Sequence, residues 1–237
     1  MNWAGKHVVI LGGSSGIGKE IARQVLERGA MAHIVGRSQA RLTQSVQELG
    51  QNVLAHQAEI ANEADVKRLF GDINRIDHLV TTAADLTFKP FLDLTDGEIA
   101  KMLGAKFWGP IYAVRHAARR ISRDGSITFF SGLAASKGSP GASILAALNA
   151  GLEGLMRTLA VELSPIRVNV VSPGIVATPI WDQMSQEKKT AYFNEVARSL
   201  PVKRVGTPED LAQAALSLME NGFISATVLH VDGGAGV

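Results

Sequence analysis

Short apolar runs that alternate with longer amphipathic segments most narrowly limit what this chain can fold into. Seven runs rich in Val and Ile predict strands, at His7–Leu11, 32–36, Val53–Gln57, 78–82, 126–131, 167–172 and 227–231. Helical spacing of apolar residues predicts helices at 16–28, Gln39–Leu49, Glu63–Asp72, 96–122, 143–163, 183–199 and 208–221. Strands that alternate with helices form a parallel sheet covered on both faces. We therefore expect an α/β fold, a doubly wound seven-stranded parallel sheet in a single domain over residues 1–237.

Composition excludes several other classes of protein. Hydrophobic residues make up 46% of the chain, enough for a large core, and the net charge of +2 forms no basic stripe, so we expect no nucleic-acid partner. The absence of cysteine excludes disulfides, thiolate catalysis and cysteine-ligated metals. The six histidines lack metal-ligand spacing, so no metal is expected. No signal peptide precedes the first strand and no apolar run reaches about 18 residues, so we expect a cytoplasmic protein with no membrane partner. We interpret the histidines in or beside predicted strands as structural: His7, His33, His56, His78 and His230.

A glycine-rich turn joins the first predicted strand to the first helix. It reads Leu11-Gly12-Gly13-Ser14-Ser15-Gly16-Ile17-Gly18. Backbone amides at a helix N-terminus, together with the helix dipole, favour the diphosphate of a dinucleotide. Because the turn follows a strand, opens a helix and begins an alternating chain, it predicts a Rossmann-like dinucleotide site. The residues that we assign to this site are Gly12, Ser14, Ser15, Gly16, Ile17 and Gly18.

The end of the second predicted strand bears on the choice of dinucleotide. An acidic residue there would bind the ribose hydroxyls of NAD, but this chain has Arg37 followed by Ser38. A guanidinium is suited to forked contacts with a 2′-phosphate. Arg37 and Ser38 therefore predict NADP(H) as the cofactor. The alternative for Arg37 is a solvated surface arginine.

Further motifs follow the other predicted strands. Ala58-Glu59-Ile60 follows the third, Thr81-Thr82-Ala83-Ala84 ends the fourth, residues 167–174 hold the sixth with a Pro-Gly turn, and Val231-Asp232-Gly233-Gly234 ends the last. Together with the Gly12-x-x-x-Gly16-x-Gly18 turn, these motifs resemble the short-chain dehydrogenase/reductase family over essentially the whole chain. The resemblance implies further cofactor-binding residues, namely Glu59, Ile60, Ala83, Pro173, Gly174, Val176 and Thr178.

The catalytic positions of that family carry other residues in this sequence. The family uses a Ser after the fifth strand, a Tyr and a Lys four residues apart on the next helix, and an Asn on the preceding helix. The resemblance places Gly132, Leu145 and Asn149 at the Ser, Tyr and Lys positions, and Lys106 at the Asn position. Leu145 has no ionisable proton, so the family's usual proton transfer is absent.

Four polar residues are candidates to replace the missing groups. Lys106 could place an ammonium near a developing oxyanion, and Ser131 or Asn149 could donate a hydrogen bond. Tyr192 could reach the site from the segment 178–204. Each of the first three has a structural alternative: Lys106 snorkelling to the surface, Ser131 satisfying backbone at a strand end, and Asn149 capping a polar pocket.

Three functions remain open from the sequence. The first is an NADP(H)-dependent oxidoreductase with a rearranged site, acting on a small-molecule carbonyl, alcohol or activated alkene. The second is a catalytically inactive, dinucleotide-responsive regulator or partner subunit, because all four usual groups are replaced together. The third is a cofactor-independent lyase or isomerase, against which the glycine turn and Arg37 count. The resemblance to a family of oxidoreductases favours the first over the second.

The segment 178–204 is the longest departure from the strand–helix alternation. It carries Trp181, Met184, Tyr192 and Phe193. We expect it to be either a lid over a substrate pocket or a helical insertion packed on the body.

The helices predicted at 96–122 and 143–163 resemble the pair that family members use for dimerisation. This resemblance implies a homodimer or a homotetramer. Small residues that would allow close approach of these helices are Gly109, Ala113, Ala117, Ala146, Ala147 and Ala150.

Overall fold

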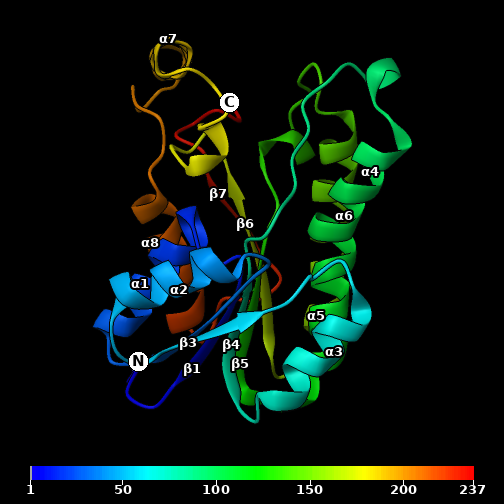
Figure 1. Ribbon diagram of the computed structural model, residues 1–237. Coiled ribbons are helices and arrows are strands. Elements are labelled where there is room, and N and C mark those ends of the chain that lie inside the picture. The colour runs from blue at the N-terminus through cyan, green and yellow to red at the C-terminus, as the bar shows by residue number, and fades with distance from the viewer. Residues whose placement is uncertain (1) are drawn as a thin grey trace.

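Seven parallel strands form one sheet in the computed structural model of the protein, which describes residues 2–237 (Figure 1). The strands are β1 His7–Leu11, β2 Met31–Gly36, β3 Val53–Gln57, β4 Ile76–Thr81, β5 Ile121–Phe130, β6 Arg167–Pro173 and β7 Val228–Val231. They lie in the order β3-β2-β1-β4-β5-β6-β7. Strands β2 and β3 extend the sheet from one edge of β1, whereas β4 pairs with the other edge of β1. The winding direction therefore reverses between β1 and β4. The predicted doubly wound α/β fold is confirmed.

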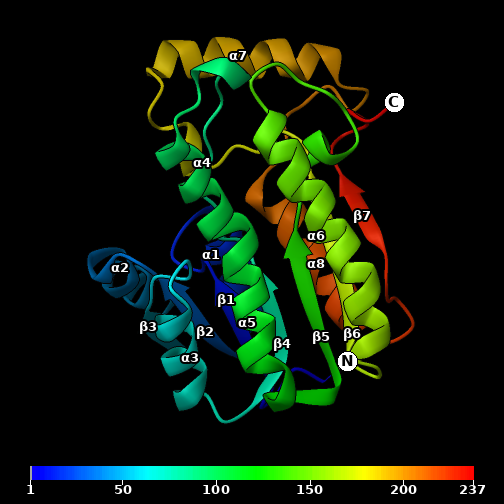
Figure 2. The ribbon, with the colours of Figure 1, turned by 90° about the vertical axis from the view of Figure 1, so that its right-hand side faces the viewer.

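Helices cover both faces of this sheet (Figures 1 and 2). They are α1 Gly16–Glu27, α2 Gln39–Leu49, α3 Glu63–Asp72, α4 Asp96–Leu103, α5 Gly109–Ala117, α6 Ser143–Glu162, α7 Gln186–Ser199 and α8 Pro208–Glu220. In β1, Val8 and Ile10 belong to the core with α1 and α8, whereas Val9 and Leu11 belong to the core with α3 and α5. All four are fully buried, which explains why the strands are continuously apolar.

The prediction of one continuous helix over 96–122 is wrong, because the helix is interrupted and ends earlier than expected. It is two α-helices, α4 and α5, joined by a π-helical turn at Gly104–Trp108, and it gives way to β5 at Ile121 instead of 126. Ile121 pairs with Ile76 at the start of β4, and the register shifts between Ile76 and His78. Pairing with a neighbouring strand, which local helix propensity does not report, therefore sets the start of β5.

The helix expected at 183–199 begins three residues later than expected. Ser185 is its N-cap, and the Ser185 side chain accepts a hydrogen bond from the Lys188 amide, so α7 begins at Gln186. The preceding residues form a short 3-10 turn at Pro179–Trp181. Helix α7 lies across the carboxyl ends of the strands, at the top of Figure 2.

Helix α6 combines a buried face with a largely exposed apolar one. Contrary to the expectation that no apolar run is long enough, it could cross a membrane by length and composition, but it packs along β5 and β6 as part of the layer. Its residues Ala147, Ala150 and Gly154 are exposed, and Val161 is 77% exposed. The apolar surface of α6 is therefore only partly covered within one copy of the chain.

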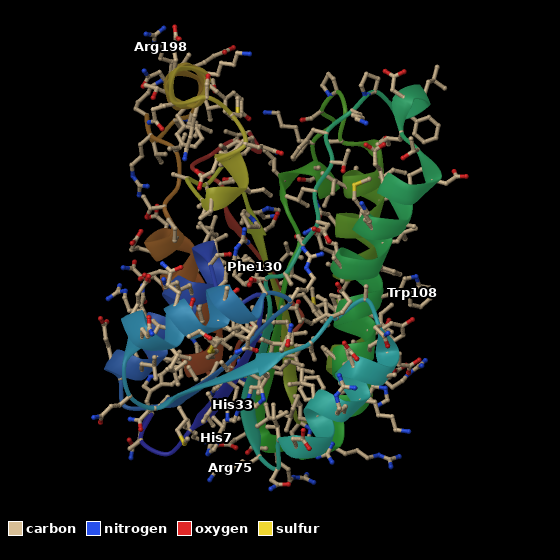
Figure 3. The ribbon with its side chains drawn as sticks, in the orientation of Figure 1. His7, His33, Arg75, Trp108, Phe130 and Arg198 are labelled. Atoms are coloured by element: carbon tan, nitrogen blue, oxygen red, sulfur yellow. The ribbon has the colours of Figure 1, made fainter. Side chains whose placement is uncertain are left out.

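The small residues expected to form a helix interface on α5 lie instead inside the protomer. Ala113 and Ala117 are fully buried, and a Cβ added to Gly109 would lie 2.9 Å from Ile60 Cδ1. These residues let α5 approach α3 and the sheet closely. Trp108 is an exposed aromatic residue of this region, 45% exposed, and it points away from the body in Figure 3.

The amino ends of the strands carry a buried structural carboxylate. Asp77 on β4 is fully buried, and it accepts hydrogen bonds from the His7 amide at 2.8 Å, Lys6 Nζ at 3.0 Å, Arg75 Nη2 at 3.2 Å and Ser122 Oγ at 3.1 Å. These contacts hold the pKa of Asp77 below its usual range, against the effect of burial. The buried charge is paired, so removing one of its partners would destabilise the fold.

Three histidines, one on each of β1, β2 and β3, form a ladder across these strands, and Figure 3 labels the first two, His7 and His33. His7 Nδ1 lies 3.1 Å from His33 Nε2, and His33 Nδ1 lies 3.0 Å from His56 Nε2. Burial, with the two neighbouring imidazoles, lowers the pKa of His33 to about 4. Within residues 2–237, no group of His, Cys, Asp or Glu is arranged to hold a metal ion.

Candidate functional site

The candidate site lies at the carboxyl edge of the sheet, at the ends of β1 and β4, between which the winding direction of the chain reverses. In doubly wound sheets, ligands bind in the crevice at such a reversal. Leu11 at the end of β1 pairs with Val35 of β2 on one side and with Thr81 of β4 on the other. The turns that follow these strands therefore meet around the glycine-rich turn.

The glycine turn is built for close backbone approach. Gly12 has a φ of 88°, and a Cβ there would lie 2.7 Å from the Ala83 amide nitrogen. A Cβ on Gly18 would lie 2.3 Å from the Gly12 carbonyl oxygen. Gly16 has a φ of 52° and lies beside Thr178. Any side chain at position 12 or 18 would push α1 away from β4, so the crevice depends on these glycines.

The N-terminus of α1 faces the crevice with open amides. The first amides of a helix have no intrahelical partner, and the Ser15 N-cap side chain accepts no hydrogen bond from α1. The first turn of α1 carries no acidic residue that would neutralise the dipole. The Ser45 hydroxyl donates to the Ser14 carbonyl at 3.1 Å, which fixes the backbone of Ser14. This arrangement can bind a diphosphate through the backbone of 14–18.

Arg37, at the end of β2, is held in an ion pair. Its Nη1 lies 2.9 Å from Asp85 Oδ2 and its Nη2 lies 3.0 Å from Asp85 Oδ1, while Glu59 Oε2 lies 3.8 Å from Nη1. The hydrogen bonds with Asp85 raise the pKa of Arg37. The side chain is 57% exposed, so the alternative of a solvated surface arginine stays open.

The other residues expected on the adenosine side lie around this pair. Ser38 caps α2 by accepting from the Arg41 amide at 3.4 Å. The Glu59 side chain accepts from the Ala61 amide at 3.1 Å, which fixes the turn after β3. Ile60 is buried against Gly109 of α5. The turns after β2 and β3 thus flank the glycine turn on the Arg37 side.

The residues expected on the opposite side follow β6. The Gly174 amide donates to the Val231 carbonyl at 3.1 Å, and a Cβ at position 174 would lie 2.8 Å from Asp232 Cα. Val176 is buried and bridges to Gly206, which brings Thr178 back beside Gly16. The structure therefore places the loop after Pro173 next to the start of α1.

The residues at the family's catalytic positions form two kinds of surroundings. Leu145 is 4% exposed and packs in a small apolar cluster with Met102 and Leu148. Asn149, one turn later on α6, is also 4% exposed, and its Nδ2 donates to the Gly132 carbonyl at 3.4 Å. Its Oδ1 is buried without a partner. A Cβ on Gly132 would lie 3.0 Å from Asn149 Nδ2, so Gly132 makes room for this amide.

Lys106 lies in the π-helical turn with its ammonium buried. The residue is 7% exposed, and Nζ donates to the Phe130 carbonyl at 3.2 Å and to the Ser131 carbonyl at 3.1 Å. Burial lowers the pKa of Lys106 to about 8. The side chain does not snorkel to the surface. Lys106 and Asn149 together contact three successive carbonyls at the end of β5.

The two other candidates have different partners. The Ser131 hydroxyl donates to Glu153 Oε1 of α6 at 2.9 Å. Tyr192 lies in an aromatic cluster with Trp181, Phe193 and Phe88, and burial raises its pKa. Ser131, Asn149 and Lys106 therefore meet at the end of β5, whereas Tyr192 belongs to the segment above it.

Sequence reasoning missed three residues that take part in this arrangement: Asp85, Phe88 and Glu153. Asp85 follows directly after the 81–84 turn, and its acidic type beside a strand end was the signal that could have found it. Glu153 lies four residues after Asn149, on the same face of α6. Phe88, in the loop between β4 and α4, had no local signal.

Comparison with known proteins agrees with this geometry. The family described as enoyl-(acyl carrier protein) reductase matches residues 12–236. A protein named short-chain dehydrogenase/reductase malC, from Malbranchea aurantiaca, is 33% identical over 97% of this chain and 94% of its own. Carbonyl reductase family member 4 from Danio rerio is 30% identical over 95% of this chain and 96% of its own. A solved small-chain dehydrogenase in complex with NADPH is 32% identical, covers 98% of each chain and has a TM-score of 0.86.

The buried ammonium of Lys106 makes stability depend on pH in a defined direction. The unfolded side chain keeps its proton up to a pKa of 10.5, whereas the folded one loses it near pH 8. Between these values the unfolded chain binds more protons, so the unfolding free energy attributable to Lys106 rises with pH, on the order of 3 kcal/mol in all. Urea unfolding at pH 7 to 10.5 will show the wild type gaining stability relative to Lys106→Met. Lys101→Met, at an exposed lysine on α4, serves as the control with a constant difference. A constant difference for Lys106→Met as well would contradict a lowered pKa.

Proposed function

Because the chain belongs to the short-chain dehydrogenase/reductase family, we propose that it is an NADP(H)-dependent oxidoreductase that acts on a small-molecule carbonyl, alcohol or activated alkene. The observation that supports the proposal is the end of β1, where the first amides of α1 are open and the guanidinium of Arg37 follows the neighbouring strand β2.

The residues of the crevice fit such a cofactor. The cradle over Gly12 and Gly18 leaves no space for a Cβ, as close backbone approach to a diphosphate requires. The amides of 14–18 would hold the diphosphate, Arg37 and Ser38 the 2′-phosphate, and Glu59, Ile60 and Ala83 would flank the adenosine. Pro173, Gly174, Val176 and Thr178 would hold the nicotinamide half. When bound, NADPH supplies a hydride to an electrophilic carbon of the substrate.

The chain's own polar groups would stabilise the charge that develops on the substrate oxygen. The ammonium of Lys106 is buried and donates hydrogen bonds to the Phe130 and Ser131 carbonyls. In such surroundings a fixed positive charge acts more strongly than in water. Asn149 has a buried amide with unused hydrogen-bonding capacity, which suits it to contact a ligand in the crevice. Lys106 and Asn149 are therefore the proposed polar components of the rearranged site, with Ser131 held by Glu153 beside them.

The segment 178–204 is proposed as the lid of the substrate pocket. Trp181 stacks with Phe88 from the loop after β4, with ring centroids 6.3 Å apart, and Trp181 Nε1 donates to the Val176 carbonyl at 2.9 Å. The aromatic cluster thus connects the α7 side of the crevice with its opposite wall. An apolar, aromatic roof favours substrates with a flat apolar body.

One observation favours the inactive regulator as a second candidate. Leu145 is packed in an apolar cluster at the position where the family carries its tyrosine. In this case the protein binds NADP(H) without transferring hydride.

A cytoplasmic location remains a prediction of the sequence.

Turnover tests the proposal directly. Purified protein with NADPH and a panel of aromatic ketones, aldehydes and enones will oxidise the cofactor, and Lys106→Met will lower kcat by about 10²-fold, because a fixed charge near the developing oxyanion is lost. In the wild type, kcat will fall as pH rises past about 8, where the Lys106 ammonium loses its proton. The control, Lys101→Met, will keep wild-type kcat.

Two results would contradict this assignment in different ways. Full activity in Lys106→Met would remove Lys106 from the site. Tight NADPH binding with no hydride transfer across the panel would instead favour the regulator.

We also propose that the protein forms a homodimer or homotetramer through the exposed apolar face of α6. Ala147, Ala150 and Gly154 would permit close helix approach, and Val161 and Trp108 add apolar area around them. Light scattering after size exclusion will give a multiple of the 25.2 kDa chain mass. Ala150→Arg will shift it toward the monomer, because a long charged side chain cannot be buried there unpaired. A monomeric wild type would overturn this proposal.

A further inference from the structure

Asp85 occupies the guanidinium that the 2′-phosphate would need. The two carboxylate oxygens of Asp85 accept hydrogen bonds from Arg37 Nη1 at 2.9 Å and from Arg37 Nη2 at 3.0 Å. This is the forked geometry by which arginine also binds phosphate. Glu59 is more distant, at 3.8 Å, and contributes a single contact. Asp85 is therefore the principal anion on Arg37.

The two partners come from opposite sides of the crevice. Arg37 follows β2 and Asp85 follows β4, and both strands pair with β1 in the sheet. Their ion pair consequently spans the crevice over the end of β1, beside the glycine turn. Gln57 Nε2 donates to the Arg37 carbonyl at 3.0 Å, so the backbone beneath the guanidinium is fixed while its head group is free to exchange partners.

The ion pair between Arg37 and Asp85 is exposed enough for a ligand phosphate to replace the carboxylate. The Arg37 side chain is 57% exposed and that of Asp85 is 32% exposed. Ion pairs with this degree of exposure are weak, and a dianionic phosphate is a stronger partner for the same fork than a carboxylate. Asp85 makes no other side-chain hydrogen bond within residues 2–237, so releasing Arg37 leaves no buried group unpaired.

We propose that Asp85 competes with the 2′-phosphate of NADP(H) for the guanidinium of Arg37. This competition limits the preference of the protein for NADP(H) over NAD(H). The inference rests on the proposed function and assigns a specificity-determining role to a residue outside the cofactor motifs. A ligand with a 2′-phosphate must displace the Asp85 carboxylate. A ligand with a 2′-hydroxyl does not compete for the guanidinium and binds without that exchange.

Calorimetric titration with two nucleotide fragments isolates this exchange from catalysis. The probes are adenosine 2′,5′-bisphosphate, which carries the 2′-phosphate, and adenosine 5′-monophosphate, which lacks it. Asp85→Asn will bind the bisphosphate about two- to fivefold more tightly than the wild type, the range expected for removing an exposed ion pair. Its affinity for the monophosphate will stay unchanged. Asp93→Asn, an exposed acidic residue on the same loop, will bind both probes as the wild type does.

A double-mutant cycle shows whether the effect passes through Arg37. In an Arg37→Met background, Asp85→Asn will bring no gain for the bisphosphate, because there is no guanidinium to release. Weaker bisphosphate binding in Asp85→Asn would overturn the inference, since Asp85 would then orient Arg37 for the phosphate. Equal affinity of wild type and Asp85→Asn would also overturn it while leaving the proposed function intact. Failure of the wild type to bind either probe would overturn the proposed function and this inference with it.

Discussion

The carbonyl oxygen of Leu11 connects the two halves of the sheet, and the rest of the site depends on it. It accepts hydrogen bonds from the Thr82 amide at 2.8 Å, the Ala83 amide at 3.0 Å and the Thr82 hydroxyl at 3.0 Å. These bonds hold the turn after β4 against the end of β1. The glycine turn can bring α1 into the same place only because Gly12 and Gly18 lack side chains. This contact therefore fixes the turn after β4, which Asp85 follows, relative to the start of α1.

A second set of contacts defines the floor of the site at the end of β5. Two side chains from different helices, Lys106 and Asn149, contact the carbonyls of 130, 131 and 132 in succession. One is an ammonium whose pKa burial lowers to about 8, and the other is an amide with an unpaired buried oxygen. The site has therefore kept a positive charge and a polar amide next to the strand end, although Leu145 supplies an apolar surface where the family carries a phenol. In the proposed function these two groups would stabilise charge on the substrate oxygen, in place of proton transfer by a tyrosine.

The sequence predicted those parts of the molecule that local chemistry determines. Continuous apolar runs indicated the strands, because both faces of a parallel sheet are buried. The spacing of Gly12, Gly16 and Gly18 indicated the turn, because only glycine permits its backbone geometry. The start of β5 at Ile121 and the π-helical turn around Lys106 were not predictable, since pairing with β4 and packing within the fold determine them. Asp85 and Phe88 were missed for a related reason, because their partners, Arg37 and Trp181, lie 48 residues and more away along the chain.

Amide NMR can test whether the amides at the start of α1 hold the diphosphate of NADP(H). In ¹H–¹⁵N spectra recorded during titration of the uniformly labelled protein with NADPH, we expect the largest shifts at Ser14 to Gly18, with further shifts at Arg37 and Ser38. A saturable titration whose shifts lie elsewhere on the surface, or no response to NADPH at all, would contradict it.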